Sequence, residues 1–187
     1  SKAIPIGVLD RCIKLTNEPP SGVKANLTRA FCSFAQDEIN EMDGKSRCIL
    51  FGLCHFHAVM LERRTFGPKG YNMMYPFAIG DLRDSVVCLT NYMETAGSKI
   101  PWDDLKYIFG EIMYGGHIVN DFDRLLANTY LDFYMKEELL DETELYPYAS
   151  DEKGVSFMSP SPTSFDSYLK HIDETLKGET PIAFGLH

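Results

Sequence analysis

The chain has 187 residues, 44% of them hydrophobic and 12% aromatic, and it carries a formal net charge of −9 at pH 7. This composition excludes wholesale disorder and is sufficient for a domain with its own core. The acidic balance argues against nucleic-acid and anionic-membrane partners, because cationic side chains dominate phosphate binding. Residues 136–187 hold 11 acidic and 4 basic side chains, a net of −7, so the charge is concentrated there.

The cysteines and the ends of the chain bear on its cellular setting. An odd number of cysteines without a secretory leader favours reduced thiols in the cytosol: Cys12, Cys32, Cys48, Cys54 and Cys88. No apolar run approaches the roughly 18 residues that a membrane span needs. The chain lacks an initial Met and stops abruptly at His187, so we expect a piece of a longer protein.

The first 42 residues divide into a connector and a helix. Pro5 and the Pro19-Pro20 pair interrupt helix formation in residues 1–20, because proline lacks a backbone N–H and clashes with the preceding turn. From Gly22 to Met42, apolar residues recur at steps of three and four, which predicts an amphipathic helix. These residues are Leu27, Ala30, Phe31, Phe34, Ala35 and Ile39.

Residues 46–65 form the most hydrophobic segment. Apolar side chains cover most of its helical circumference, which predicts a helix at the centre of a bundle. Glu62, Arg63 and Arg64 mark the end that we expect to face solvent. Residues 66–76 contain glycine, proline and several aromatics, which indicates a loop pinned to the body of the protein.

Three further helices are predicted, over residues 81–96, from Pro101 to the Gly115-Gly116 pair, and from Asn120 or Asp121 onward. Proline favours the first helical position, glycine follows helix ends, and Asn or Asp caps helix starts. For the last of these helices we expect an inward face made of Phe122, Leu125, Leu126, Thr129, Tyr130 and Phe133.

The composition and periodicity of the sequence change after Leu140. Residues 146–163 contain four serines and three prolines with little periodicity, which indicates an extended arm across the surface. A final helix is predicted over about residues 164–177, ended by Gly178. The predicted fold is therefore all-α, with about six helices, a long irregular C-terminal arm and a final helix.

Nucleotide and metal sites are both disfavoured. A Walker A loop is absent, and Gly67-Pro68-Lys69-Gly70 is too short to replace it. Cys48, Cys54, His55 and His57 are candidate zinc ligands, but a structural zinc prefers two clustered pairs and these residues share one apolar helix. We favour packed thiols and hydrogen-bonded imidazoles, and keep a zinc enzyme using Cys54, His55 and His57 as an alternative.

The charged residues at helix ends have structural explanations. Arg63 and Arg64 suit a solvated helix end, with an ion pair or phosphate contact to a neighbouring module as the functional alternative. The adjacent acids Asp103/Asp104 and Asp121/Asp123 lie at helix starts, where carboxylates are favourable. His117 has no nearby nucleophile in sequence. We predict no catalytic, cofactor-binding or metal-binding residue.

Four motifs in order, spread over residues 4–187, resemble the C-terminal motor region of dynein heavy chains. They are TNEPP at 16–20 with GVKANL at 22–27, FGLCHFHAVMLERRTFGPKGYN at 51–72, FGEIMYGGHI at 109–118 with NDFDR at 120–124, and FGLH at 184–187. The glycine-rich run at 109–118 is similar to axonemal heavy chains, and the whole resembles their outer-arm beta type.

The resemblance implies the small helical lid of the sixth AAA+ module. Residues 1–21 would be the connector from the large subdomain, 22–140 the lid bundle, and 141–187 an arm with a final helix. It also implies a part that does not hydrolyse ATP, within a minus-end-directed microtubule motor whose ATP sites and microtubule contact lie elsewhere. The localisation implied is the cytoskeleton and the axoneme of cilia or flagella.

The resemblance implies partners within the dynein complex, namely the neighbouring AAA+ modules and the C-terminal domain of the same heavy chain. The predicted interface consists of a helix end and two turns: Arg63, Arg64, Phe66, Gly67, Pro68, Gly115, Gly116 and His117. We give Gly67, Gly115 and Gly116 the role of backbone freedom, and Arg63 or Arg64 that of an ion-pair donor. A free-standing helical adaptor that binds a peptide or partner helix is the alternative.

Overall fold

A computed structural model describes residues 5–15, 18–97, 99–141, 144–150 and 156–176. Gly178 and the 184–187 motif, on which two of the predictions above rest, lie outside these ranges. The elements in chain order are α1 (Ile6–Leu9), α2 (Val23–Phe31), α3 (Gln36–Glu41), α4 (Gly44–Arg63), η1 (Arg64–Lys69), α5 (Ile79–Ala96), α6 (Trp102–Tyr107), η2 (Ile108–Met113), η3 (Gly115–His117), α7 (Asp121–Tyr134), η4 (Glu137–Leu140), β1 (Pro147–Ser150), β2 (Ser156–Met158) and α8 (Phe165–Thr175).

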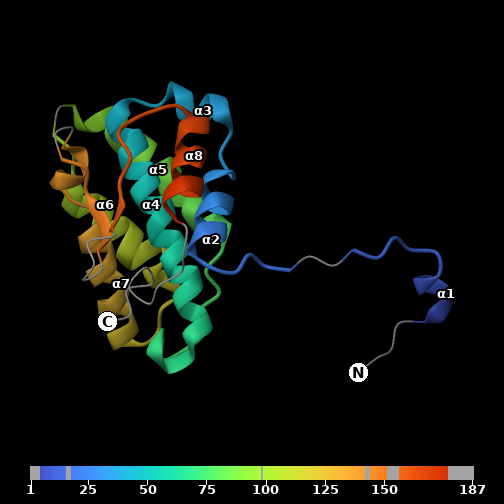
Figure 1. Ribbon diagram of the computed structural model, residues 1–187. Coiled ribbons are helices and arrows are strands. Elements are labelled where there is room, and N and C mark those ends of the chain that lie inside the picture. The colour runs from blue at the N-terminus through green and yellow to red at the C-terminus, as the bar shows by residue number, and fades with distance from the viewer. Residues whose placement is uncertain (1–4, 16–17, 98, 142–143, 151–155, 177–187) are drawn as a thin grey trace.

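The predicted all-α fold is confirmed, and α4 lies at its centre (Figure 1). Every side chain from Cys48 to Met60 is buried, and α2, α5 and α7 pack around the helix. The carboxylate of Asp43 accepts a hydrogen bond from the backbone N–H of Ser46 and caps its start. A Cβ added at Gly52 would come within 3.3 Å of Tyr134 and Leu139, so glycine allows close packing there.

The predicted helix over residues 22–42 is two helices. Its first part ends at Phe31, and α3 begins after Ala35, whose N–H bonds the Glu38 carboxylate. The intervening turn lets Phe34 join Phe31 and Ile39 in the core, with Phe34 only 4% exposed. A continuous helix would hold these three side chains in one row along a single axis, whereas the observed turn changes the direction of the chain between them. Packing in the core therefore outweighs the helical periodicity of this segment.

The helix expected from Pro101 begins one residue later and changes its winding. It continues beyond Tyr107 as the π-helical turn η2. Gly110 lies in this turn, and a Cβ there would be 2.3 Å from the side-chain oxygen of Asn128 in α7. A wide turn carrying glycine thus lets the two segments approach closely.

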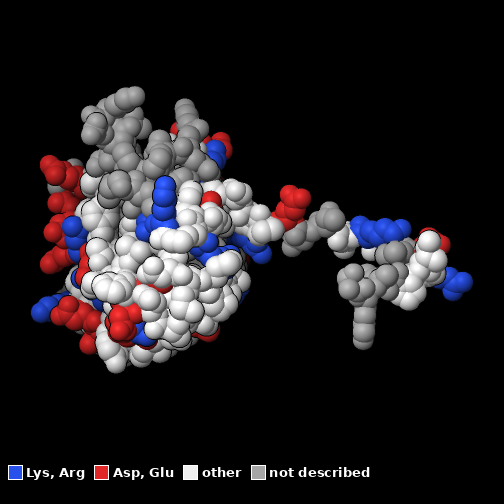
Figure 2. Space-filling model, turned by 90° about the horizontal axis from the view of Figure 1, so that it is seen from below, with Lys and Arg blue, Asp and Glu red and all other residues white. Residues whose placement is uncertain are grey.

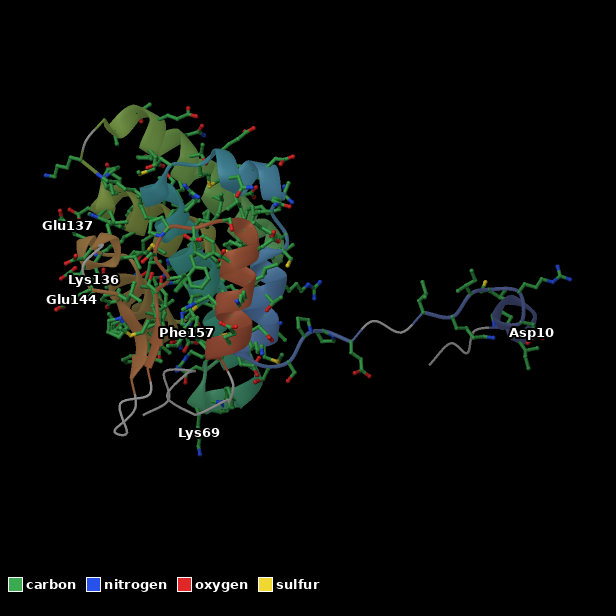
Figure 3. All side chains as sticks on the ribbon, turned by 45° about the horizontal axis from the view of Figure 1, so that its top comes forward. Asp10, Lys69, Lys136, Glu137, Glu144 and Phe157 are labelled. Carbon is green, nitrogen blue, oxygen red and sulfur yellow. The ribbon has the colours of Figure 1, made fainter. Side chains whose placement is uncertain are left out.

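Part of the expected irregular arm forms a hairpin. Strands β1 and β2 pair antiparallel, and the N–H of Ser159 donates to the Tyr146 carbonyl at 2.7 Å. The hairpin buries the aromatic side chains of Tyr148 and Phe157 against the bundle, and Figure 3 labels Phe157. Burial of these rings explains why a segment rich in Ser and Pro is held on the bundle.

The final helix α8 packs on α2 and α3 (Figure 1). Its Tyr168 is fully buried, with ring centroids 5.1 Å from Phe31 and 5.2 Å from Phe51. The aromatic cluster joins α8 to the same core as α2 and α4. The division into residues 1–21, 22–140 and 141–187 stays a prediction.

Residues 5–15 extend away from the body, with α1 and Asp10 at the far end (Figures 1 and 3). This arm exposes apolar side chains, among them Ile13 at 89% and Leu15 at 88%. On the body, acidic side chains gather along one edge, beside a broad area with few charges (Figure 2). Within the described ranges, no helix is long and apolar enough to cross a membrane.

We expect Tyr168→Ala to lower the free energy of unfolding by about 3–5 kcal/mol, because it empties an aromatic site in the core. Tyr107→Ala is the matched control: that tyrosine is 61% exposed, so the loss should stay within about 0.5 kcal/mol. Urea denaturation of both variants checks this. An equal, small effect would show that α8 contributes little to the core.

Candidate functional site

The end of α4 is buried, which corrects the expectation of a solvated end. Arg63 is 4% exposed and Glu62 is 6% exposed. One Arg63 guanidinium nitrogen donates to the Tyr130 hydroxyl at 2.8 Å, and another to the Gly70 carbonyl at 3.1 Å. Its guanidinium carbon also lies 4.9 Å from the Tyr130 ring centroid, a cation–π contact. Arg63 is thus turned inward and joins α4 to α7, and an ion pair from Arg63 to another module stays a prediction.

Glu62 has internal partners as well. Its carboxylate accepts from the Gly22 N–H at 2.9 Å and from the Asn26 side-chain amide at 3.0 Å. The Thr65 hydroxyl donates to the Glu62 carbonyl. These bonds satisfy a buried carboxylate and tie the start of α2 to the end of α4.

The turn that follows α4 is exposed, as the predicted interface requires. Phe66, Gly67 and Pro68 are exposed, and Lys69 points away from the body (Figure 3). Gly67 has φ +58°, a conformation that favours glycine. Gly70 packs so closely that a Cβ there would be 1.8 Å from the Arg63 carbonyl oxygen. The tip of this turn, Phe66–Pro68, is therefore exposed, while Gly70 at its base is closely packed against Arg63. The role of the tip as an interface stays a prediction.

The second predicted interface turn is attached to α5. His117 Nε2 lies 2.9 Å from an Asp81 carboxylate oxygen, and the imidazole is part-buried. Gly115 is buried, and a Cβ there would meet the Gly110 carbonyl at 2.1 Å. Gly116 is exposed. Gly115 therefore serves close packing inside the fold, whereas Gly116 and His117 keep access to solvent.

The candidate metal ligands are packed in the core. His55 is 1% exposed, and its ring stacks on Tyr148 with centroids 4.7 Å apart. His57 Nδ1 lies 2.8 Å from the Tyr114 hydroxyl. Among the described residues, no three His, Cys, Asp or Glu side chains are placed to hold a metal ion. Burial raises the pKa of the Cys54 thiol far above its ordinary range, which disfavours a thiolate ligand or nucleophile there.

The inward face expected for α7 is wrong for four of its six residues, whereas Leu126 and Tyr130 are partly buried and pack against the core. Asn120 caps the helix as predicted, accepting from the N–H groups of Phe122 and Asp123. Phe122 is 77% exposed and Leu125 is 65% exposed, and both Thr129 and Phe133 also face outward. The buried residues are instead Asp123, Ala127, Leu131 and Tyr134.

Asp123 explains the rotation of α7. Its carboxylate accepts from the Asn72 backbone N–H at 3.0 Å, from the Asn72 side-chain amide and from the Tyr75 hydroxyl at 2.7 Å. These donors come from a loop about 50 residues away, so helical periodicity carries no sign of them. They draw Asp123 inward and leave Phe122, Leu125 and Phe133 outside; we call these three residues the α7 strip.

The comparisons with known proteins agree with the architecture. Residues 46–187 match the model of the "Dynein heavy chain AAA lid domain". The chain is 50% identical over 98% of its length to the ciliary dynein beta chain of Tripneustes gratilla, and 50% identical over 98% to axonemal dynein heavy chain 17 of Mus musculus. It is 46% identical over its full length to the flagellar outer-arm dynein beta chain of Chlamydomonas reinhardtii. The chain spans 4% of the length of each relative.

We expect Arg63→Met to lower the free energy of unfolding by roughly 2–4 kcal/mol, because it removes a buried cation whose partners remain buried. Arg83→Met is the matched control, since Arg83 is exposed and donates only to the Ser33 carbonyl among its described hydrogen bonds. Its loss should stay below about 1 kcal/mol. Urea denaturation measures both, and equal losses would contradict the role given to Arg63.

Two buried histidines should make the fold sensitive to acid. Burial lowers the pKa of His55 from 6.5 to about 3 and that of His57 to about 4. The unfolded chain binds these protons below pH 6.5 while the folded chain does not, so this stability is present above pH 6.5 and falls towards pH 4. Between pH 7.5 and 5.0 we expect a loss of roughly 2 kcal/mol per imidazole.

Thermal or urea denaturation of His55→Phe across this pH range checks the assignment. The variant keeps an aromatic ring in the stack and should lose roughly 2 kcal/mol of the pH dependence. His171→Phe, at a partly exposed position on α8, is the control. Equal flattening of the pH profile in both variants would contradict the assignment to the buried ring.

Proposed function

The chain belongs to the family of dynein heavy chain AAA lid domains, and from this premise we propose that it is a mechanical lid in a microtubule motor of cilia or flagella. The lid hydrolyses no ATP itself and passes rigid-body shifts between neighbouring modules of the same heavy chain. The ATP sites, the minus-end-directed movement and the microtubule contact belong to other parts of the motor. The printed names of the relatives, ciliary, axonemal and flagellar, support this setting.

The exposed α7 strip is the observation that carries the proposal. Its aromatic and aliphatic side chains lie on one side of a helix, at positions 122, 125 and 133. An apolar strip of this kind is typical of a surface that packs against another protein segment. We assign it as a contact with an adjoining module or the C-terminal domain, as expected for a lid inside a ring of modules.

Fixed packing behind the strip suits a mechanical role. Arg124 of α7 donates to the Glu111 carboxylate at 2.8 Å and to the Ile118 carbonyl. Lys106 of α6 pairs with Asp132 at 2.9 Å. Together with the Asp123 contacts, these bonds hold α7 to η2, to α6 and to the loop that carries Asn72 and Tyr75. A force applied to the α7 strip would therefore move the helical bundle as one rigid body.

The exposed tip of η1 offers a second contact. We assign Arg64, Phe66, Gly67 and Pro68 to it, and Gly116 and His117 to the turn beside α5. In this role the lid needs no cofactor of its own, and it joins the dynein complex through its own heavy chain. The sixth AAA+ module is the position that we propose for it.

The test uses the full heavy-chain motor carrying Phe122→Ser and Leu125→Ser together. Both positions are exposed, so the isolated 187-residue chain should keep its stability within about 1 kcal/mol. The motor should lose microtubule gliding velocity or microtubule-stimulated ATP turnover, because the module contact is weakened. Val87→Ser, at an exposed apolar position on α5, is the control. Full activity in the double variant, or robust ATP turnover by the isolated chain, would contradict the proposal.

A further inference from the structure

A cavity of about 330 Å³ lies between α2, the end of α4 and the start of α5, beside the Pro19-Pro20 pair. Most of its wall is apolar, with Leu61 and Phe77 among the lining residues. The polar side chains in its lining are Asn26, Arg29, His57, Glu62, Arg64 and Thr65. The cavity is separate from the α7 strip, so it extends the proposed role without depending on that contact.

The histidine has a buried nitrogen without a partner. His57 lines the cavity and is 1% exposed. Its Nδ1 is engaged by the Tyr114 hydroxyl, whereas its Nε2 has no hydrogen-bond partner within the described part of the chain. Burial keeps the pKa of His57 near 4, so the ring is neutral at pH 7. When the Tyr114 hydroxyl donates to Nδ1, Nε2 carries the hydrogen and is a donor.

The two arginines of the lining have N–H donors left for a ligand, whereas the Glu62 carboxylate is already hydrogen-bonded. Arg29 is exposed and has no hydrogen-bond acceptor or ion-pair partner among the described residues. Arg64 has one long hydrogen bond, 3.4 Å to the Tyr75 carbonyl. Glu62 already accepts from Gly22 and Asn26. Among the charged side chains of the lining, the unengaged donors of Arg29 and Arg64 therefore exceed the unengaged acceptors of Glu62, which favours an anion as ligand.

The charge balance selects the kind of anion. Arg29 and Arg64 against Glu62 leave a formal charge of +1 in the lining. Asp81 stands close enough to His57 to act on its pKa, which places a further negative charge nearby. A polyphosphate would meet repulsion from both acids, whereas one carboxylate matches the two guanidinium groups. The apolar wall suits a hydrocarbon side chain next to that carboxylate.

We propose that this cavity binds an Asp or Glu side chain of a protein segment, with an apolar residue beside it. Arg29 and Arg64 hold the carboxylate, and the His57 imidazole, whose buried Nε2 has no partner among the described residues, forms part of the cavity wall. Since the cavity also touches Pro19 and Pro20, a bound segment would contact the start of the lid and its bundle at once.

The test is a titration of the 187-residue chain with acetylated, amidated Leu-Glu-Leu, followed by NMR of the imidazole nitrogens and by calorimetry. We expect saturable binding that shifts the His57 Nε2 resonance. Leu-Gln-Leu should bind at least threefold more weakly, and Arg29→Gln and Arg64→Gln should each weaken the binding of Leu-Glu-Leu roughly threefold to fivefold. Arg83→Gln, outside the lining, should leave it unchanged.

Inorganic pyrophosphate and ATP form the second arm of the test. Tighter binding of either than of the Glu peptide would overturn the assignment to a carboxylate. An absence of saturable binding, or affinity that both cavity variants leave unchanged, would overturn the site itself. The circular dichroism spectrum of each variant confirms that it folds, and both substitutions lie at positions with solvent access.

Discussion

The whole structure depends on burying α4 on every side. A helix buried around most of its circumference requires neighbours on all those sides. The elements α2, α5, α7 and η4 supply them, together with Tyr148 of the β hairpin, which packs on Phe51 and His55. Polar groups on such a helix need partners inside the protein, because water cannot reach them. Most of them have one, but His55 Nδ1 and His57 Nε2 have no hydrogen-bond partner among the described residues. His57 meets Tyr114, Glu62 meets Gly22 and Asn26, and Arg63 meets Tyr130 and Gly70. The polar residues of the central helix thus dictate where the surrounding elements lie.

The sequence predicts the parts of the fold that local patterns control. Apolar residues around the whole of 46–65 place that helix at the centre, and Asn120 predicts the start of α7 correctly. The orientation of α7 could not be predicted this way, because its sequence carries two apolar stripes. Asn72 and Tyr75, far away in the chain, select the stripe that includes Asp123. The hairpin was likewise missed, because burial of Tyr148 and Phe157 decides its position.

The candidate site shows the same limit. The exposed turn at Phe66–Pro68 can be predicted from its glycine and proline, whereas its role as an interface stays a prediction. Arg63 sits in the same motif and resembles an exposed cation at a helix end, yet carbonyl groups from the next turn enclose it. Its burial depends on close approach of Gly70 to α4, which only the three-dimensional arrangement reveals.

These constraints also explain how one lid can present separate contacts without loosening its core. The strip on α7 and the η1 tip lie on different elements, and the cavity beside Pro19 and Pro20 shares Arg64 with η1. Each of the three is formed by α4 or by an element packed on it. The buried pairs Glu62–Asn26 and Arg63–Tyr130 lie on either side of the end of α4. Displacing α2 relative to α7 would break one of these pairs and leave a charge buried without its partner, at a cost of several kcal/mol. In the role that we propose, force applied at one contact would therefore be transmitted to the others by movement of the whole bundle.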